Sequence, residues 1–200
     1  MIFNKKDHIL HKKGFISQKD CDFFINFFEK RKDLHVRGTT GGKEFEVPDK
    51  KQDTEIILNT SKNFPWISSH YLKCGIEEYI KKYPFSVQVG PWAVSSTYKM
   101  QRYDPGEAYF VTHCENSGPI PKEPKILRRI LAWMIYLNNV TDGGHTEFPS
   151  QNTKFQPRRG DLLIWPAYFT HPHHGIVSKT QTKYIITGWY EFVDPASYDY

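Results

Sequence analysis

The chain has 200 residues, a formal net charge of +5 and an aromatic content of 16%. That length suits one compact domain, and the aromatic content argues against a disordered chain. The positive charge is small and spread over many lysines, which favours a solvated surface over a nucleic-acid groove. The three cysteines include no C-x-x-C pair, and no run is apolar enough for a leader or a membrane span. We therefore expect a cytoplasmic protein without disulfides or a membrane partner.

Helical spacing is clearest in the first part of the chain. Ser17 and Asp20 form a start similar to a capping box. The apolar residues that then follow at helical spacing are Cys21, Phe24, Ile25 and Phe28. A second helix is predicted over residues 66–82, with one face formed by Ile67, Tyr71 and Cys74. Between the two helices, residues 37–52 read as a flexible polar loop and residues 55–58 as a short strand.

From residue 86 onward, short β-rich runs alternate with turn residues, which is typical of an antiparallel sandwich or a small barrel. We therefore predict an α+β, mainly β fold class with a double-stranded β-helix (jelly-roll) core over about 86–193. Helical support is expected over about 14–83, and residues 1–200 are expected to form a single domain. The β-rich runs are SVQVG (86–90), AVSSTYKMQRY (93–103), AYFVTH (108–113), ILAWMIYLNNV (130–140), GHTEF (144–148), DLLIWPA (161–167) and KYIITGWYEF (183–192).

His113 and Glu115 lie at the end of one of these predicted strands. Residues two apart on an extended chain point the same way, so the imidazole and the carboxylate should project together. An H-x-E triplet is common by chance, and taken alone it is best interpreted as an ordinary surface pair. It gains meaning only if other ligands converge on it.

The segment THPHHG, residues 170–175, holds three histidines in four residues. Exposed turn histidines or a zinc site would also give this pattern. A structural zinc site requires four nitrogen or sulfur ligands, and the scattered cysteines supply no ligand pair. Zinc is therefore disfavoured, and the histidines are candidate partners of the H-x-E pair.

The predicted strand 183–192 carries Lys183 on the same face as apolar and aromatic residues. Such a lysine either extends its ammonium to solvent or binds an anion, because an unpaired buried ammonium is costly. Two imidazoles and one carboxylate match the facial triad of non-haem iron(II) oxygenases, which leaves three positions of the metal open. 2-Oxoglutarate and O2 would fill those positions, and Lys183 would bind the distal carboxylate of 2-oxoglutarate.

Residues 98–192 resemble the prolyl 4-hydroxylase-like branch of the Fe(II)/2-oxoglutarate-dependent dioxygenases, of the bacterial and phage type. The resemblance covers about half of the chain, and the N-terminal part only loosely. It rests on the order and spacing of five motifs. These are Y-x-x-G near the H-x-E, a YLN strand, a GG-x-T-x-F turn, a P-x-x-G-x-L strand, and a distal histidine about ten residues before a basic residue.

The resemblance implies a role for each matching residue. His113 and Glu115 correspond to the proximal metal ligands, and Lys183 corresponds to the residue that binds the distal carboxylate of 2-oxoglutarate. Tyr136 matches a tyrosine that helps to hold that carboxylate, and Tyr103 matches a tyrosine that contacts the cofactor. The residues expected to face the same cofactor pocket are Thr187 and Trp189.

The third metal ligand must be chosen among the clustered histidines. His173 lies ten residues before Lys183, which is the usual gap in the family, and it is the histidine of an H-x-G sequence that ends at Gly175. His171 lies five residues after Pro166, a spacing that some members would favour. We prefer His173 as the third catalytic ligand, with His171 and His174 as alternatives that would otherwise lie around the metal.

Glu115 departs from the resemblance, because the usual carboxylate at this position is aspartate. Glutamate keeps the charge and both oxygens but is one methylene longer, so the metal site could be shifted. This departure keeps open a catalytically silent jelly-roll module with a binding or structural role. A carboxylate at this position also disfavours a halogenase, which would need it to be absent.

The resemblance implies hydroxylation of an unactivated C–H bond, with release of succinate and CO2 and with ascorbate as a candidate reductant. The expected substrate is a prolyl residue of a peptide or protein, with a free amino acid or a nucleic acid as alternatives. A cupin-type metal enzyme is disfavoured because it needs no lysine for 2-oxoglutarate. Residues 37–52 and 116–126 are candidate lids over the substrate.

Overall fold

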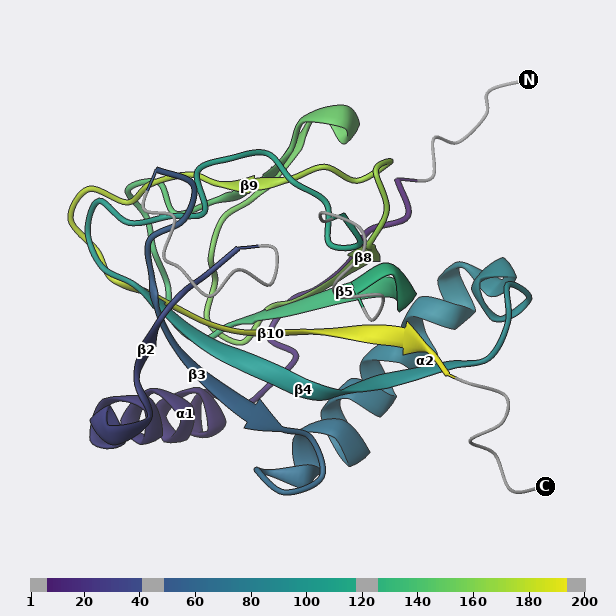
Figure 1. Cartoon of the computed structure of the whole chain (residues 1–200), viewed down its shortest axis with the longest axis horizontal. Coiled ribbons are helices and arrows are strands. Elements are labelled where there is room, and N and C mark those ends of the chain that lie inside the picture. Colours follow the sequence, from purple (N-terminus) through teal and green to yellow (C-terminus); the bar gives the residue numbers. More distant parts are fainter. Residues whose placement is uncertain (1–6, 41–48, 118–125, 194–200) are drawn as a thin grey trace.

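The computed structural model describes residues 7–40, 49–117 and 126–193 (Figure 1). The helices in this part of the chain are α1 (Gln18–Lys30) and α2 (Lys73–Lys82), and a π-helical segment, Ile67–Leu72, runs directly into α2. Short 3-10 segments cover Lys32–Leu34, Pro84–Val87, Ile126–Arg128 and Pro149–Gln151. The strands are β1 (Leu10–Lys12), β2 (Val36–Arg37), β3 (Thr54–Asn59), β4 (Trp92–Tyr103), β5 (Arg129–Tyr136), β6 (Thr146–Phe148), β7 (Thr153–Phe155), β8 (Leu162–Pro166), β9 (His174–Gly175) and β10 (Lys183–Phe192).

These strands form two antiparallel sheets. The large sheet has the order β1-β8-β5-β10-β4-β3-β2, and the small sheet has the order β7-β6-β9. Neighbours in the large sheet are mostly distant in sequence, as when β10 pairs with both β4 and β5. Figure 1 shows α1 and α2 on one side of the large sheet and β9 on the other. The predicted mainly β, jelly-roll fold class is confirmed.

The small sheet continues through backbone bridges that lie outside its named strands. Tyr109 bridges Lys51, and His113 bridges His173. The predicted strand at residues 108–113 is therefore an extended segment held at isolated bridges rather than a regular strand. Its place beside β9 brings the H-x-E pair next to the clustered histidines.

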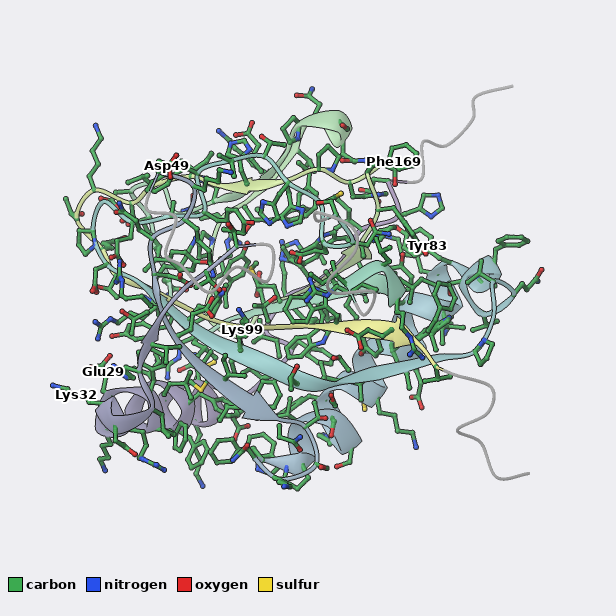
Figure 2. The ribbon with its side chains drawn as sticks, in the orientation of Figure 1. Glu29, Lys32, Asp49, Tyr83, Lys99 and Phe169 are labelled. Atoms are coloured by element: carbon green, nitrogen blue, oxygen red, sulfur yellow. The ribbon has the colours of Figure 1, made fainter. Side chains whose placement is uncertain are left out.

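Apolar side chains pack on both faces of the large sheet, because successive residues of each strand point to opposite faces. On one face, Tyr98, Met100 and Ile186 pack with α1 and α2 in the main core. On the other face, Tyr103 and Ile185 pack with residues of the small sheet in a second core. The candidate site residues lie on this second face, and side chains occupy the space between the sheets (Figure 2).

The first predicted helix is confirmed, whereas the second departs from its predicted phase. The hydroxyl of Ser17 accepts a hydrogen bond from the Asp20 backbone N–H at 3.1 Å and caps α1. The second helix begins with a π-helical segment, whose wider turn rotates the residues that follow relative to a regular helix. Cys74, which was predicted to lie on the buried face, is exposed, and Leu72, Gly75 and Tyr79 are buried instead.

One predicted strand was wrong. Residues 86–90 lie in and after a 3-10 turn that begins at Pro84, and the strand begins only at Trp92. Proline fixes a φ that suits the start of a helical turn, and Gly90 with Pro91 then separates this turn from β4. The predicted strand at 55–58 is confirmed within β3.

The segment expected to give helical support also contributes β2 and β3 to the large sheet. The candidate lids fall partly on residues 41–48 and 118–125, which lie outside the described residues. Among the described residues, no helix has both the length and the apolar character needed to cross a membrane.

Candidate metal centre and cofactor cavity

The backbone brings three segments of the chain together at one point. His113 and His173 exchange two backbone hydrogen bonds, of 3.0 and 2.9 Å. The backbone N–H of Glu115 donates to the Ala167 carbonyl oxygen at 2.9 Å, which ties this residue to the end of β8. The pairing therefore fixes three chemically active side chains that are up to 60 positions apart in the sequence.

The side chains of His113, Glu115 and His173 converge. Their potential ligand atoms all lie within 4.8 Å of one another, and His173 Nε2 and His113 Nε2 lie 3.2 and 3.7 Å from Glu115 Oε1. Each ring points its other nitrogen, Nδ1, at a backbone carbonyl: that of Val111 at 3.0 Å and that of His171 at 3.1 Å. These contacts select the tautomer whose Nε2 lone pair faces the carboxylate, so the donor set fits an iron(II) ion.

The other two histidines of the cluster point elsewhere. His171 Nε2 lies 2.8 Å from the Asp7 carbonyl oxygen, and this imidazole is buried away from the triad. His174 Nε2 lies 3.5 Å from a Glu147 carboxylate oxygen. Alternation along the extended segment explains the difference between His173 and His174, because neighbouring side chains point to opposite faces.

Glu115 offers one oxygen to a metal because protein donors engage the other. The indole N–H of Trp189 donates to Oε2 at 2.8 Å, and Arg129 Nη1 lies 3.7 Å from the same oxygen. Arg129 also donates to the Glu115 backbone carbonyl at 2.9 Å, and its guanidinium lies 3.5 Å from the centre of the Trp189 ring. Burial raises the pKa of Glu115, but hydrogen bonds and positive charge from His113 and His173, when these imidazoles are protonated, outweigh burial and hold the pKa well below its usual range.

An aromatic ring supports one of the imidazoles. Tyr109 stacks on His113 with a centroid distance of 3.6 Å and an interplanar angle of 12°. Together with the contact to the Val111 carbonyl, this stacking leaves the His113 ring little freedom to turn. The position of Tyr109 could not be predicted from the sequence, because nothing in its spacing distinguishes it from a core aromatic.

A cavity of about 360 Å³ opens beside the triad, between the two sheets. Lys183 lines it from β10 and is only 5% exposed. Its ammonium donates to the Gly144 carbonyl oxygen at 3.1 Å and lies 4.6 Å from the centre of the Tyr103 ring. Burial lowers the pKa of Lys183 to about 8, although the nearby Asp53 carboxyl opposes the change. A buried cation without a salt bridge among the described residues marks this end of the cavity as a site for an anion.

Other residues predicted to face the cofactor occupy different positions. Thr187 and Trp189 line the cavity, and the Thr187 hydroxyl donates to the Trp133 carbonyl oxygen at 2.8 Å. Tyr136 is fully buried and lies behind the wall, and its hydroxyl donates to the Thr146 hydroxyl at 2.7 Å. Thr146 itself lines the cavity. Its hydroxyl accepts the Tyr136 proton and directs its own proton at the Met134 sulfur, 3.7 Å away, a weak acceptor that a ligand carboxylate in the cavity could replace.

Thr146 was not singled out in the sequence, although it stands in the GG-x-T-x-F turn that carried part of the resemblance. A group of buried polar residues was also missed, since their loop and short strand carried no motif. They are Lys51, Asp53, Glu55, Lys99 and Gln101, on β3, on β4 and before β3. Figure 2 labels Lys99, whose ammonium lies 2.8 Å from a Glu55 oxygen.

Comparison with known proteins agrees with this geometry. The family model described as the 2OG-Fe(II) oxygenase superfamily matches residues 98–191. A protein of Acanthamoeba polyphaga mimivirus named a putative prolyl 4-hydroxylase is 29% identical over 157 residues, which cover 69% of this chain. The chain spans 63% of the length of that relative.

Solved structures show the same fold. The viral collagen prolyl hydroxylase of Paramecium bursaria Chlorella virus-1, in its 2OG complex, superposes with a TM-score of 0.66 at 19% identity, covering 96% of this chain and 100% of that one. A prolyl hydroxylase of Trichoplax adhaerens, in complex with a peptide fragment of hypoxia inducible factor, gives a TM-score of 0.67 at 16% identity, covering 93% and 84%.

The family match defines a class: residues 98–191 carry a 2OG-Fe(II) oxygenase domain. The chain is similar in sequence to a protein named a putative prolyl 4-hydroxylase and in fold to a viral collagen prolyl hydroxylase. The match also agrees with the predicted cofactors, Fe(II), 2-oxoglutarate and O2.

Proposed function

We propose that this protein is an Fe(II)- and 2-oxoglutarate-dependent dioxygenase that hydroxylates a prolyl residue of a peptide or protein. The observation that carries the proposal is the convergence of His113, Glu115 and His173 beside a cavity that contains a buried lysine. The relatives named as prolyl hydroxylases, one of them bound to a peptide, support the substrate class.

The proposed triad would hold the iron through two imidazole nitrogens and Glu115 Oε1. Iron(II), with 2-oxoglutarate and O2, supplies the oxidising power for hydroxylation of an unactivated C–H bond, with release of succinate and CO2. Lys183 would bind the distal carboxylate of 2-oxoglutarate, and Thr146 would donate a second hydrogen bond to it. The protein residues would thus hold the cofactors in one orientation.

The position of Arg129 supports a peptide as the substrate. It lines the cavity from β5 and stacks on Trp189, and its Nε, which makes no hydrogen bond among the described residues, lies 3.9 Å from a Glu191 carboxylate oxygen. A guanidinium in this position can donate to a backbone carbonyl of a bound peptide. Ascorbate is proposed only as an external reductant.

Cofactor binding can be tested before any substrate is known. Adding Fe(II) and 2-oxoglutarate to the protein without O2 should give a weak visible charge-transfer band. His113→Ala should remove the band, whereas His174→Ala should keep it, because His174 points to Glu147 rather than to the triad. A wild-type protein that binds iron but gives no band would support a catalytically silent module instead.

Substrate class requires a separate assay. Succinate release and the addition of one oxygen atom would be followed by mass spectrometry with proline-rich peptides, with the same peptides carrying alanine for proline, and with oligonucleotides. The proposal expects the added oxygen on the proline of the first set alone. Oxidation of an oligonucleotide, or of the alanine peptides to the same extent, would contradict it.

A further inference from the structure

A buried polar network lies along the cavity wall next to Lys183, and the proposed function gives it no task. Strand register builds it: Glu55 on β3 lies opposite Gln101 on β4, and Tyr103 on β4 lies opposite Lys183 on β10. Gln101 and Tyr103 are two residues apart on one strand, so their side chains share the cavity face. Both line the cavity, and both are at most 6% exposed.

The charge on Glu55 fixes the orientation of the Gln101 amide. Glu55 forms ion pairs with Lys51 and Lys99, and these cations outweigh its burial and lower the pKa of Glu55. A carboxylate only accepts hydrogen bonds, so the group of Gln101 that lies 2.7 Å from Glu55 Oε1 must be the NH2. The reverse orientation would place the amide oxygen against the carboxylate, and the two would repel each other.

The orientation of Gln101 in turn decides what the Tyr103 hydroxyl does. The remaining amide oxygen of Gln101 lies 3.1 Å from that hydroxyl, and an amide oxygen can only accept. Tyr103 must therefore donate its single proton to Gln101. Its ring faces the opposite partner, with the Lys183 ammonium 4.6 Å from the ring centre, a distance at which a cation is attracted to the ring face.

We propose that Gln101, held by Glu55, takes the hydroxyl proton of Tyr103, so that Tyr103 supports 2-oxoglutarate binding through its ring beneath Lys183 and not through a hydrogen bond to the distal carboxylate. Lys183 and Thr146 then supply the hydrogen bonds at that end of the cavity. The inference rests on the proposed function, and it specifies how Tyr103, which the sequence resemblance implies to contact the cofactor, would support cofactor binding.

The test is a comparison of affinity with stability in protein loaded with Co(II), which binds 2-oxoglutarate without turnover. Dissociation constants for 2-oxoglutarate would be measured by calorimetry, and melting temperatures by circular dichroism. Tyr103→Phe should keep the dissociation constant within threefold of wild type while the melting temperature falls, because the Gln101 oxygen loses its donor. Thr146→Val also removes one hydroxyl, but from β6 of the small sheet. This substitution should weaken 2-oxoglutarate binding at least fivefold.

Two further variants separate the ring from the hydroxyl. Tyr103→Leu removes the ring and should weaken 2-oxoglutarate binding at least threefold. Gln101→Met removes the acceptor and frees the Tyr103 proton, so binding should be unchanged or tighter. If Tyr103→Phe does not fold, Gln101→Met decides the matter, since an increase of threefold or more in its dissociation constant would overturn the proposal.

The outcomes distinguish this inference from the proposed function. Failure of the wild-type protein to bind 2-oxoglutarate would refute both. Binding by wild type with a loss of threefold or more in Tyr103→Phe would show that the phenol donates to the cofactor, and only the assignment of Tyr103 and Gln101 would fall. An unchanged dissociation constant in Tyr103→Leu would likewise refute the role of the ring.

Discussion

Lys183 is expected to stabilise the bound cofactor at the expense of the fold. The substitution Lys183→Met keeps the length and the apolar stem of the side chain but removes the ammonium. Each pKa unit corresponds to about 1.4 kcal/mol, so lowering the pKa of a buried lysine from 10.5 to about 8 corresponds to a penalty of about 3 kcal/mol for keeping it charged. The substitution removes this penalty, but it also removes the hydrogen bond to the Gly144 carbonyl, which costs about 1 kcal/mol of stability.

The net gain of about 2 kcal/mol should raise the melting temperature of Lys183→Met by about 4–8 °C at pH 7, for a chain of this size. At the same pH, loss of a charge-assisted hydrogen bond worth about 1.5–3 kcal/mol should weaken 2-oxoglutarate binding roughly 10- to 150-fold. Calorimetry on Co(II)-loaded protein and thermal melting of the metal-free protein measure the two effects separately. Lys179→Met, at an exposed site, is the matched control.

The pH dependence gives the same prediction a second measurement. Below pH 8, Lys183 is protonated in both the folded and the unfolded state, so the full penalty is present. Between pH 8 and 10.5 the unfolded state binds more protons, and this group makes the wild type more stable as the pH rises. The difference in melting temperature between Lys183→Met and wild type should therefore be largest below pH 8 and shrink toward pH 10.5.

The affinity for 2-oxoglutarate should follow the charge on Lys183. Above pH 8 the free wild-type protein loses the ammonium, so its affinity for 2-oxoglutarate should fall about tenfold per pH unit, while the affinity of Lys183→Met stays flat. A variant that melts below wild type at pH 7, or that binds 2-oxoglutarate as tightly as wild type, would refute the reasoning. It would mean either that water reaches the ammonium or that another cation binds the carboxylate.

The remaining predictions concern the metal ligands. Trp189→Phe removes the indole hydrogen bond to Glu115 Oε2 and should weaken Co(II) binding about 10- to 100-fold in a chelator competition, while Trp92→Phe, which loses a similar bond far from the site, should not. Glu115→Asp draws the carboxylate back by about 1.5 Å and breaks the same bond, so it should also weaken metal binding rather than improve it, and tighter binding would contradict the geometry. His173→Ala should abolish stoichiometric Co(II) binding while His171→Ala keeps it, because His171 Nε2 is taken by a backbone carbonyl, and the reverse result would reassign the third ligand.

Much of the fold could be predicted because its signals are local. Short β-rich runs bounded by turn residues located β4, β5, β8 and β10, and helical spacing after a capping residue located α1. Alternation also placed Lys183 on the cavity face of β10. The π-helical segment before α2 and the 3-10 turn at 84–87 were not predicted, because both change the backbone geometry without changing the spacing of apolar residues in the sequence.

The candidate site was predicted less completely, because several contacts depend on which strands become neighbours. The place of Tyr136 behind Thr146 follows from the meeting of β5 with the small sheet. The Glu55 network follows from the pairing of β3 with β4, which spacing within either segment does not indicate. Trp189 was expected in the pocket, but its hydrogen bond to Glu115 needed both segments in place.

The sequence by itself determined the chemistry that is available: an imidazole and a carboxylate two residues apart, a cluster of histidines, and a lysine on an apolar strand face. The tertiary structure decided which histidine faces the carboxylate, which oxygen of Glu115 is free, and which hydroxyl points into the cavity. The physical reason is that side-chain direction along a strand is a local property. The partner that each side chain meets depends instead on backbone pairing between segments far apart in the chain.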